Sequence, residues 1–339
     1  MTAIALEIRS DRGVFDELAE WWNGCPGPRT SPFLRSDWFS LWADSFLTKG
    51  QTLEVAIWRT DERPLAILPL SREGIRRASL SNAHGDVFDV IMEEENAGEH
   101  VESWLTRRPA TRLYRLDGAS PLFSGLSSAG LHVTGRSESP YLDLSGGIDG
   151  VRTAMGDNLN KNIDRLERRL SKLGQTTYLD NADGVIPGAV ETCMELEASG
   201  WKGETGTAML SQPESGRFYR GLIELARSRG WLRLATLTIG DQIIACQFCL
   251  DYNGSRFLLK PAYDESLKKH SPGKVLQWMV IREAVDRGLD TYEFGGDAED
   301  WKMHWTQTTR PRVSAIQFAS NGPTRLVGQS MKLLYERTR

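Results

Sequence analysis

The sequence has few of the features that mark secreted, membrane-spanning or metal-dependent proteins. Only four cysteines occur in 339 residues, and they are too scattered for a disulfide framework, which predicts reduced thiols. No window holds 18 uninterrupted apolar residues, and the first residues lack a basic segment followed by an apolar one. We therefore expect a cytoplasmic protein without a secretory leader or a membrane span.

The sequence also has only a small excess of one sign of charge and few histidines. The 41 Lys and Arg residues against 45 Asp and Glu leave a net charge of -4, which gives no general attraction to nucleic acid. The five histidines form no H-E-x-x-H or similar spacing, so we expect no catalytic metal. Cys246 and Cys249 have C-x-x-C form but lie in a strand-like run, where residues three apart face opposite sides, and we interpret them as packed thiols.

What is present is an ordinary globular mixture, 40% hydrophobic and 25% charged, in a length that suits two domains. Residues 117–150 are dense in Gly, Ser and Pro, which favours a domain junction there. We therefore predict domains at residues 1–145 and 146–339. Within the first, SDWFSLWADSF is typical of a helix with Ser36 as its N-cap.

Two predicted hairpins match each other at a fixed offset. Setting Ala66 against Ala245 aligns LEVAIWRTDERPLAILPL with LRLATLTIGDQIIACQFC without a gap, so that Leu53 falls on Leu232 and Val55 on Leu234. Asn253-Gly254 then predicts a further tight turn. With enough length for two domains, the match indicates one fold used twice.

A basic amphipathic helix is predicted between the hairpins. Leu159, Ile163, Leu166 and Leu170 repeat with helical spacing, and Gly174 marks its end. The other face carries Lys161, Arg165, Arg168, Arg169 and Lys172. This face is either simply solvated or binds anions, and the residues alone do not decide between the two.

A crossover follows the second hairpin: strand SRFLLKPAY, a loop, helix KVLQWMVIREAVDR and strand LDTYEF. The helix is entered through Ser271, Pro272, Gly273 and Lys274, with Lys268 and Lys269 just before them. Free amides at a helix N-terminus, a glycine and positive charge suit a phosphate or pyrophosphate. The alternative is a plain capped entry, with Ser271 as N-cap and Pro272 at the first helical position.

The crossover's last strand ends in two glycines. Tyr292-Glu293-Phe294 alternates as a strand does, and Gly295-Gly296 releases the chain from the sheet. Asp297 and Lys302 are then the first charged side chains able to reach the cleft at the strand's end, where ligands of α/β sheets bind.

These segments resemble a known family. S-P-G-K-V-L, the aromatic-acid-Phe strand, G-G-D and W-K-x-x-W resemble the C-terminal signature of the CelD/BcsL-like acetyltransferases, a branch of the GNAT superfamily. Ser199-Gly200-Trp201-Lys202-Gly203 resembles that family's W-K-G segment, and SPFLRSDWFSLW and LSNAHGDVFDVI resemble its N-terminal half. YEFGG with a following lysine is similar to the Fem-type aminoacyl ligases, which are double GNAT folds.

The resemblance implies an α+β fold of tandem GNAT domains, each a mixed, mostly antiparallel sheet flanked by helices. It implies an acyl-CoA donor, acetyl-CoA or longer, whose pyrophosphate the 271–274 turn and Lys269 would hold. The phosphate loop departs from the usual GNAT pattern, since His270-Ser271-Pro272-Gly273 has one glycine where others use two.

Acyl transfer to an amine needs a base for the amine's proton and a donor for the oxyanion. Asp297 is the first candidate for the base, followed by Glu293 and Tyr263, and Lys302 for the oxyanion. Candidates for the acceptor pocket are Trp201, Lys202, His84 and Asp86.

The expected function is an N-acyltransferase acting on a primary amine, either an amino sugar of a surface polysaccharide or a lipid amine such as a long-chain base. No nucleic-acid partner is expected, while peripheral association with the inner membrane or the envelope-synthesis machinery would suit such acceptors. The alternatives are a Fem-like ligase that uses aminoacyl-tRNA, and a GNAT-fold module that binds without turnover.

Overall fold

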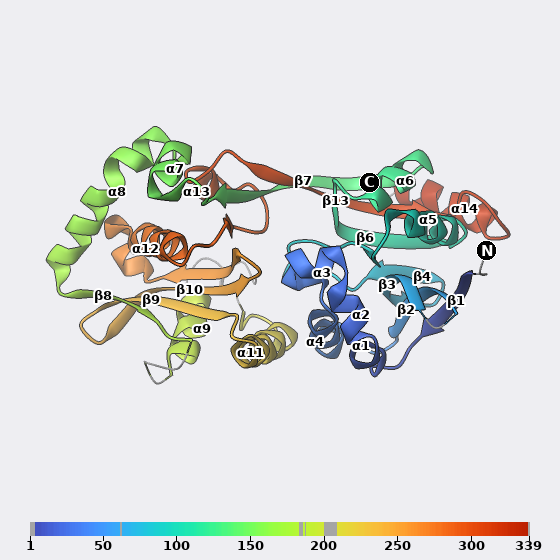
Figure 1. The fold of residues 1–339 in the computed structure, drawn as a ribbon, viewed down its shortest axis with the longest axis horizontal. Coiled ribbons are helices and arrows are strands. Elements are labelled where there is room, and N and C mark those ends of the chain that lie inside the picture. Colours follow the sequence, from blue (N-terminus) through green and yellow to red (C-terminus); the bar gives the residue numbers. More distant parts are fainter. Residues whose placement is uncertain (1–3, 62, 183–185, 187, 200–208, 338–339) are drawn as a thin grey trace. The chain divides into compact units, whose positions relative to one another are not determined.

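The two long hairpins of the chain each belong to a separate sheet (Figure 1). A computed structural model describes residues 4–337 except 62, 183–185, 187 and 200–208. The contacts divide the chain into unit 1, residues 1–138 with 310–339, and unit 2, residues 139–309. Each unit has a mixed sheet flanked by helices.

Unit 1 begins with an edge strand, continues through short helices and then builds the rest of its sheet. Its elements are β1 (Ile4–Arg9), α1 (Val14–Glu17), α2 (Ala19–Gly24), α3 (Pro26–Thr30), η1 (Pro32–Leu34), α4 (Ser36–Phe46), β2 (Thr52–Thr60), β3 (Arg63–Glu73), β4 (Arg76–Ser79), β5 (Ile91–Met92), η2 (Glu95–Ala97), α5 (Gly98–Leu105), β6 (Ala110–Asp117), α6 (Pro121–Ser128), β13 (Thr309–Phe318) and α14 (Arg325–Arg337).

In unit 2 two helices precede the edge strand. Its elements are α7 (Gly147–Ala154), α8 (Asp157–Leu170), η3 (Ser171–Leu173), β8 (Thr176–Asp180), α9 (Ala189–Ser199), α11 (Pro213–Ser228), β9 (Leu232–Ile239), β10 (Gln242–Tyr252), β11 (Ser255–Tyr263), η4 (Glu265–His270), α12 (Pro272–Asp286), β12 (Thr291–Glu293) and α13 (Asp300–Met303). Strand β7 (His132–Asp143) leads from unit 1 into unit 2.

The two sheets have the same topology. In unit 1 the strand order is β1-β2-β3-β4-β6-β13, and in unit 2 it is β8-β9-β10-β11-β12-β7. In both, three antiparallel pairs are followed by one parallel pair, β4 with β6 and β11 with β12, and then by an antiparallel one.

The predicted repeat is confirmed at the level of single residue pairs. Leu53 pairs with Ser71 in unit 1, and Leu232 pairs with Leu250 in unit 2, both members lying 179 residues further on. The same offset relates the pair Trp58–Ala66 to Leu237–Ala245. Both hairpins also shift register directly after these pairs, so the irregularity itself is repeated.

The division of the chain differs from the predicted boundary after residue 145. Strand β7 follows unit 1 in the sequence, but residues 141–143 pair with β12 of unit 2. Strand β13 follows unit 2 in the sequence, but it pairs with β6 and carries α14 back to unit 1. This return gives β6 a neighbour on the side where it would otherwise be an open edge.

Helices cover both faces of the unit 2 sheet. Helix α12 contacts β9, β10 and β11 on one face together with α8, while α9 contacts β10 and β11 on the other (Figure 1). Cys249 belongs to the core beneath α12, whereas the Cys246 thiol lies 3.8 Å from the Cys193 carbonyl of α9. The prediction that these two thiols are buried on opposite faces is confirmed. Strands buried on both faces explain the nearly unbroken apolar runs.

The predicted cap of α4 is wrong. The N-cap is Arg35, and Ser36 is the first helical residue. The Asn23 side chain takes over the capping role, because its Oδ1 accepts a hydrogen bond from the Ser36 amide (3.0 Å) and its Nδ2 donates to the Ser36 hydroxyl (3.1 Å).

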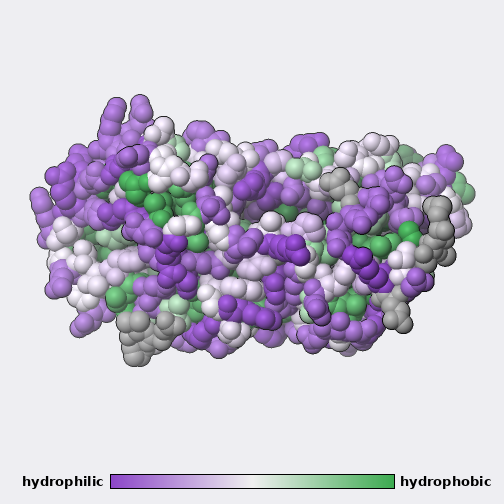
Figure 2. Space-filling view, viewed as in Figure 1, coloured by the Kyte–Doolittle hydropathy of each residue, from purple (hydrophilic) through white to green (hydrophobic). Residues whose placement is uncertain are grey.

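The surface seen in Figure 2 is mostly hydrophilic, with small apolar patches.

Candidate functional site

The parallel strands of unit 2 stay paired over only a short length. Residues Ser255–Phe257 of β11 pair with Thr291–Glu293 of β12, and among the described residues no further pair joins the two strands. Beyond this point the Phe294 amide donates to the Pro140 carbonyl (3.0 Å) and so leaves β11. From Leu258 to Tyr263, β11 therefore has no pairing with the described residues of β12.

Helix α12 begins beside this separation of the two strands, and its first turn is unusual. Ser271 has left-handed backbone angles (φ 56°, ψ 46°), and its side chain makes no capping hydrogen bond. Its carbonyl accepts from the amides of Lys274 and Val275, both at 3.1 Å. Since Pro272 has no amide hydrogen, Gly273 carries the first N–H of the helix without a partner among the described residues. Ser271 is the N-cap and Pro272 is the first helical residue, as the capped entry predicts, but a left-handed serine without a side-chain cap is typical of a functional turn.

Positive charge gathers at this helix start. The short helix η4 before it ends in Lys268, Lys269 and His270, and Lys274 follows in the first turn of α12. Burial lowers the pKa of His270, and the charges of Arg169 and Lys269 lower it further. Arg169 belongs to the basic face of α8, which contacts η4. Part of the predicted basic face thus adds to the cationic surroundings of the turn.

Gly273 also has a packing role. A Cβ at this position would lie 3.0 Å from Cδ1 of Tyr263, the last residue of β11. The tyrosine ring therefore fixes the start of α12 against the end of this strand. Burial raises the pKa of Tyr263, and the charge of Glu265 raises it further, so that the phenol keeps its proton at neutral pH.

Lys302 holds the turn that follows β12. Its side chain is buried, and its Nζ donates to the carbonyl oxygens of Gly295 (2.7 Å) and Asp297 (3.0 Å) and pairs with Glu299 (3.2 Å). Gly296 has a φ of +63°, and a Cβ there would lie 3.0 Å from the Lys302 Nζ. The two glycines are thus explained by a tight turn folded around the ammonium group.

The candidate bases occupy different environments. Glu293 is buried, with its Oε1 3.1 Å from the Thr291 hydroxyl, whereas Asp297 is exposed on the turn. Tyr263 stands at the end of β11. These residues all lie in unit 2, around the ends of β11 and β12, and the assignment of the base among them stays a prediction.

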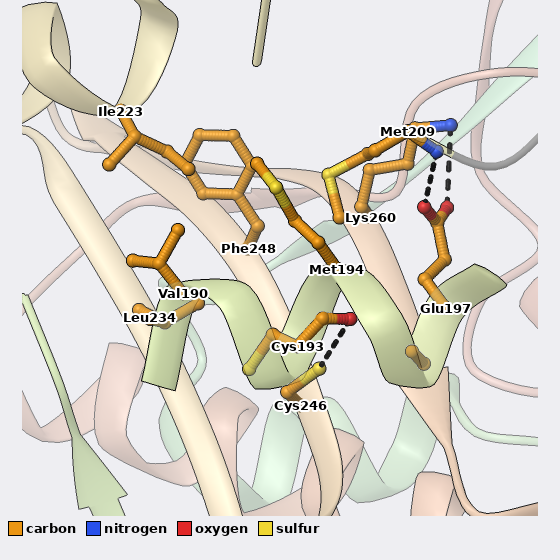
Figure 3. A pocket seen from close by; sticks show the side chains of 11 residues that line it. Val190, Cys193, Met194, Glu197, Met209, Ile223, Leu234, Cys246, Phe248 and Lys260 are labelled. Carbon is orange, nitrogen blue, oxygen red and sulfur yellow. Dashed lines mark hydrogen bonds and ion pairs between the residues drawn. The ribbon is translucent and has the colours of Figure 1, made fainter. Parts of the chain in front are cut away.

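A buried ion pair that the sequence did not reveal lies on the other face of β11 (Figure 3). The Lys260 Nζ is 3.4 Å from Oε1 of Glu197 on α9, and Oε2 of Glu197 accepts from the Met209 amide (2.7 Å). The same Nζ lies 5.3 Å from the ring centroid of Tyr219. The pair borders a cavity of about 10 Å³, whose other lining residues are Val190, Cys193, Met194, Ile223, Leu234, Cys246, Phe248 and Ala262.

The signal for this pair was a lysine within an otherwise apolar strand. Lysine is almost never fully buried unless it is paired, so Lys260 in SRFLLKPAY indicates an acidic partner. The sequence does not say which carboxylate serves, because α9 carries Glu191, Glu195 and Glu197. Two candidates for the acceptor pocket, Trp201 and Lys202, lie outside the described residues.

The remaining acceptor candidates belong to unit 1. The His84 ring stacks on Phe46, with centroids 5.2 Å apart and an interplanar angle of 10°. Asp86 is buried, and its Oδ1 and Oδ2 accept from the Nη2 atoms of Arg115 (2.9 Å) and Arg312 (3.0 Å). The Asp86 carboxylate is therefore engaged in an internal ion-pair network.

In unit 1 the backbone of Phe88 lies beside β6, at the position that corresponds to the separation of β11 from β12 in unit 2. Strands β4 and β6 also pair over three residues only, 76–78 with 110–112. Phe88 then takes the vacant position: its amide donates to the Arg115 carbonyl (2.9 Å) and its carbonyl accepts from the Asp117 amide (3.0 Å). The chain itself occupies this position in unit 1, whereas in unit 2 the described residues show only that β11 and β12 separate.

Comparison with known protein families identifies the type of domain that contains these two strands. Residues 157–303 match the profile of the acetyltransferase (GNAT) domain. The GNAT-type match begins at α8 and ends in α13, and it thus contains β11, α12 and β12. No curated protein matches the sequence. No group of three His, Cys, Asp or Glu side chains placed to hold a metal occurs in the described part of the chain.

Solved structures share the fold over nearly the whole chain. The crystal structure of FemX matches with a TM-score of 0.60 and 11% identity over 92% of this chain and 97% of its own. The C-terminal domain of a putative lysylphosphatidylglycerol synthetase from Agrobacterium fabrum matches with a TM-score of 0.54 and 12% identity, over 95% and 96%. L-PGS from Bacillus licheniformis matches with a TM-score of 0.54 and 12% identity, over 94% of this chain and 98% of its own. The predicted α+β class with two GNAT-like units is confirmed.

Proposed function

We propose that the protein is an N-acyltransferase that moves an acyl group from acyl-CoA, acetyl-CoA or longer, to a primary amine. The observation that carries this proposal is the separation of β11 from β12 directly beside the first turn of α12. A CoA thioester has a diphosphate at one end and amide groups along its arm. In this proposal the amide groups lie where the two parallel strands separate, and the diphosphate binds at the cationic helix start.

The residues around this separation fit such a donor in three respects. The left-handed Ser271 and the Gly273 amide form the turn, Lys269 and Lys274 supply positive charge, and β11 separates from β12 beside them. When bound, the thioester supplies an activated carbonyl. The chain's own contribution is to hold it in place, because positioning alone can lower much of the barrier to acyl transfer.

Proton transfer falls to the side chains around the same separation of the strands. A primary amine must lose a proton as it attacks, and a carboxylate such as Asp297 or Glu293 is suited to take it. Tyr263, whose pKa is raised by burial, is better suited to donate a proton to the departing thiol sulfur than to act as the base. Tyr263 thus changes from a candidate base to a candidate proton donor, whereas Asp297 and Glu293 keep the role of base.

The proposed acceptor is a cell-envelope precursor, either an amino sugar of a polysaccharide, as in CelD/BcsL-like enzymes, or a lipid amine such as a long-chain base. Two proteins that share the fold are named for lysylphosphatidylglycerol synthesis, which gives the lipid some support. In this proposal the protein reaches its acceptor from a peripheral position on the inner membrane.

A second candidate function is a Fem-like ligase that takes its donor group from aminoacyl-tRNA. Two observations favour it: the fold shared with FemX and the contact between basic α8 and η4. RNA phosphates bound by these residues would make binding fall steeply with salt. A module that binds without turnover is the third candidate, motivated by the single glycine of the phosphate turn.

Thermal unfolding with added CoA, acetyl-CoA and a long-chain acyl-CoA separates these candidates. A donor present at about 100 times its Kd adds about 2.7 kcal/mol of stability. We expect stabilisation by at least one thioester, reduced by Lys269→Ala with Lys274→Ala and unchanged by the control Lys49→Ala. Absence of any stabilisation would exclude the acyl-CoA proposal, and salt-sensitive binding of aminoacyl-tRNA would favour the ligase instead.

A further inference from the structure

The exposed large aliphatic side chains of the described residues lie mainly on strand β1 and on helix α14. Four of them lie on α14: Leu326 (76% exposed), Val327 (43%), Leu333 (56%) and Leu334 (62%). Positions 326 and 333, and 327 and 334, are seven residues apart, so they form one stripe along the helix. We call these four residues the α14 stripe. Four exposed aliphatic side chains thus share one side of a 13-residue helix.

The opposite side of α14 is fixed against unit 1. Met331 and Tyr335 pack on the small cluster of Ala110, Ile316 and Phe318. Gly328 lies so close to β13 that a Cβ there would stand 2.6 Å from the Ala319 amide nitrogen. The helix therefore has a defined orientation, and the α14 stripe faces outward because the other side is held.

The charged side chains of α14 indicate what the α14 stripe binds. α14 carries three cations, Arg325, Lys332 and Arg337, against a single carboxylate, Glu336, whereas the whole chain has a net charge of -4. A helix with an aliphatic stripe bordered by cations is typical of peptides that lie in the interface of an anionic bilayer. None of the described helices has both the length and the apolar character to cross a membrane.

The size of the stripe argues against a second copy as its partner. A 13-residue helix is about 20 Å long, and with a width of about 10 Å it offers roughly 200 Å². A standard protein interface buries about 800 Å² on each partner. A bilayer has no such requirement, because an amphipathic helix inserts along its own length.

We propose that α14 docks the protein on the surface of an anionic lipid bilayer, with the α14 stripe inserted among the acyl chains and Arg325, Lys332 and Arg337 at the headgroups. This inference rests on unit 1 alone and does not depend on the proposed acyl transfer. It supplies the protein with a means of reaching an amine in a membrane.

The test is co-sedimentation of the full chain with vesicles of phosphatidylcholine alone or mixed equally with phosphatidylglycerol. We expect binding to the mixed vesicles that weakens with salt, and weak binding to phosphatidylcholine alone. Leu326→Glu with Leu333→Glu should lower binding by roughly a hundredfold, since two aliphatic side chains leave the lipid. Lys332→Gln should lower it by about fivefold.

The matched control is Ile75→Glu, an aliphatic residue of unit 1 with 55% exposure in the turn between β3 and β4. It should bind as the unchanged protein does. Circular dichroism of each variant establishes that the fold is kept. Two results would overturn the proposal: mixed vesicles that fail to bind the unchanged protein, or a self-association in sedimentation velocity, without lipid, that the double Leu variant abolishes.

Discussion

Replacing Asp86 with Asn tests whether this residue holds unit 1 together or contacts an acceptor. The structure places its carboxylate between two buried guanidinium groups, Arg115 (6% exposed) and Arg312 (5%). Asparagine keeps the shape but leaves both arginines without their buried counter-charge. Breaking a buried pair in this way costs about 3–5 kcal/mol.

The expected result is a large loss of stability. For a unit of this size, 1 kcal/mol corresponds to about 2–4 °C, so the unfolding midpoint of Asp86→Asn should fall by about 10 °C. Asp117→Asn is the matched control, because Asp117 also faces Arg312 (3.6 Å) but its side chain is 36% exposed. An exposed partner contributes less than about 1 kcal/mol, and this midpoint should hardly move.

Calorimetry or circular dichroism on heating measures both variants, and titration with the thioester donor measures the site in unit 2. Donor affinity should be unchanged in Asp86→Asn, because the carboxylate lies in unit 1 and its partners are internal. An unchanged midpoint together with a raised KM for the amine acceptor would refute this reasoning and restore Asp86 to the acceptor pocket.

Three further predictions follow from buried groups. Lys260→Met should lower stability by about 3 kcal/mol because it removes the positive charge beside the buried Glu197 carboxylate, and adding Glu197→Gln should restore part of it. Equal or greater loss in the double variant in urea unfolding would contradict a coupled pair. Burial raises the pKa of Cys249 to about 12, so its thiol should react with Ellman's reagent at pH 8 only after unfolding, and rapid reaction of the folded protein would disprove its burial. Burial raises the pKa of Asp89 to about 8, so its stabilising effect is complete below about pH 4 and is lost as pH rises through 8. Asp89→Asn should therefore unfold at a higher temperature than the unchanged protein at pH 9 and gain less at pH 5; a gain independent of pH would count against this titration.

Much of the fold could be predicted because its determinants are local or repeated. The gapless match between the two hairpins predicted that one would repeat the other, since alternation and turn residues fix the register of a hairpin. The structure repeats even the register shift, which the sequence did not predict. The turn at Asn253-Gly254 is confirmed by positive φ angles at both residues. The helix from residue 158 ends at Gly174 as predicted, with a final turn of 3-10 geometry.

The errors and omissions come from contacts between distant residues. Asn23 takes the cap expected of Ser36 because α2 and α4 pack together, and no pattern within α4 indicates this. The return of β13 to unit 1 depends on which strand edge is free, which the order of elements does not reveal. Lys260 is a charged residue within an apolar strand, which indicates that it has an acidic partner. That partner, Glu197, is 63 residues away in the sequence, and only the folded chain identifies it.

The placement of β13 has a consequence for synthesis. On the ribosome, residues 1–138 emerge long before residues 309–318, so the nascent unit 1 has no strand to pair along the β6 edge until all of unit 2 has been translated. Unit 2 takes up β7 at once, since its residues precede it in the chain. Unit 2 is thus able to complete its sheet first, and unit 1 closes later around a strand that is translated after all of unit 2.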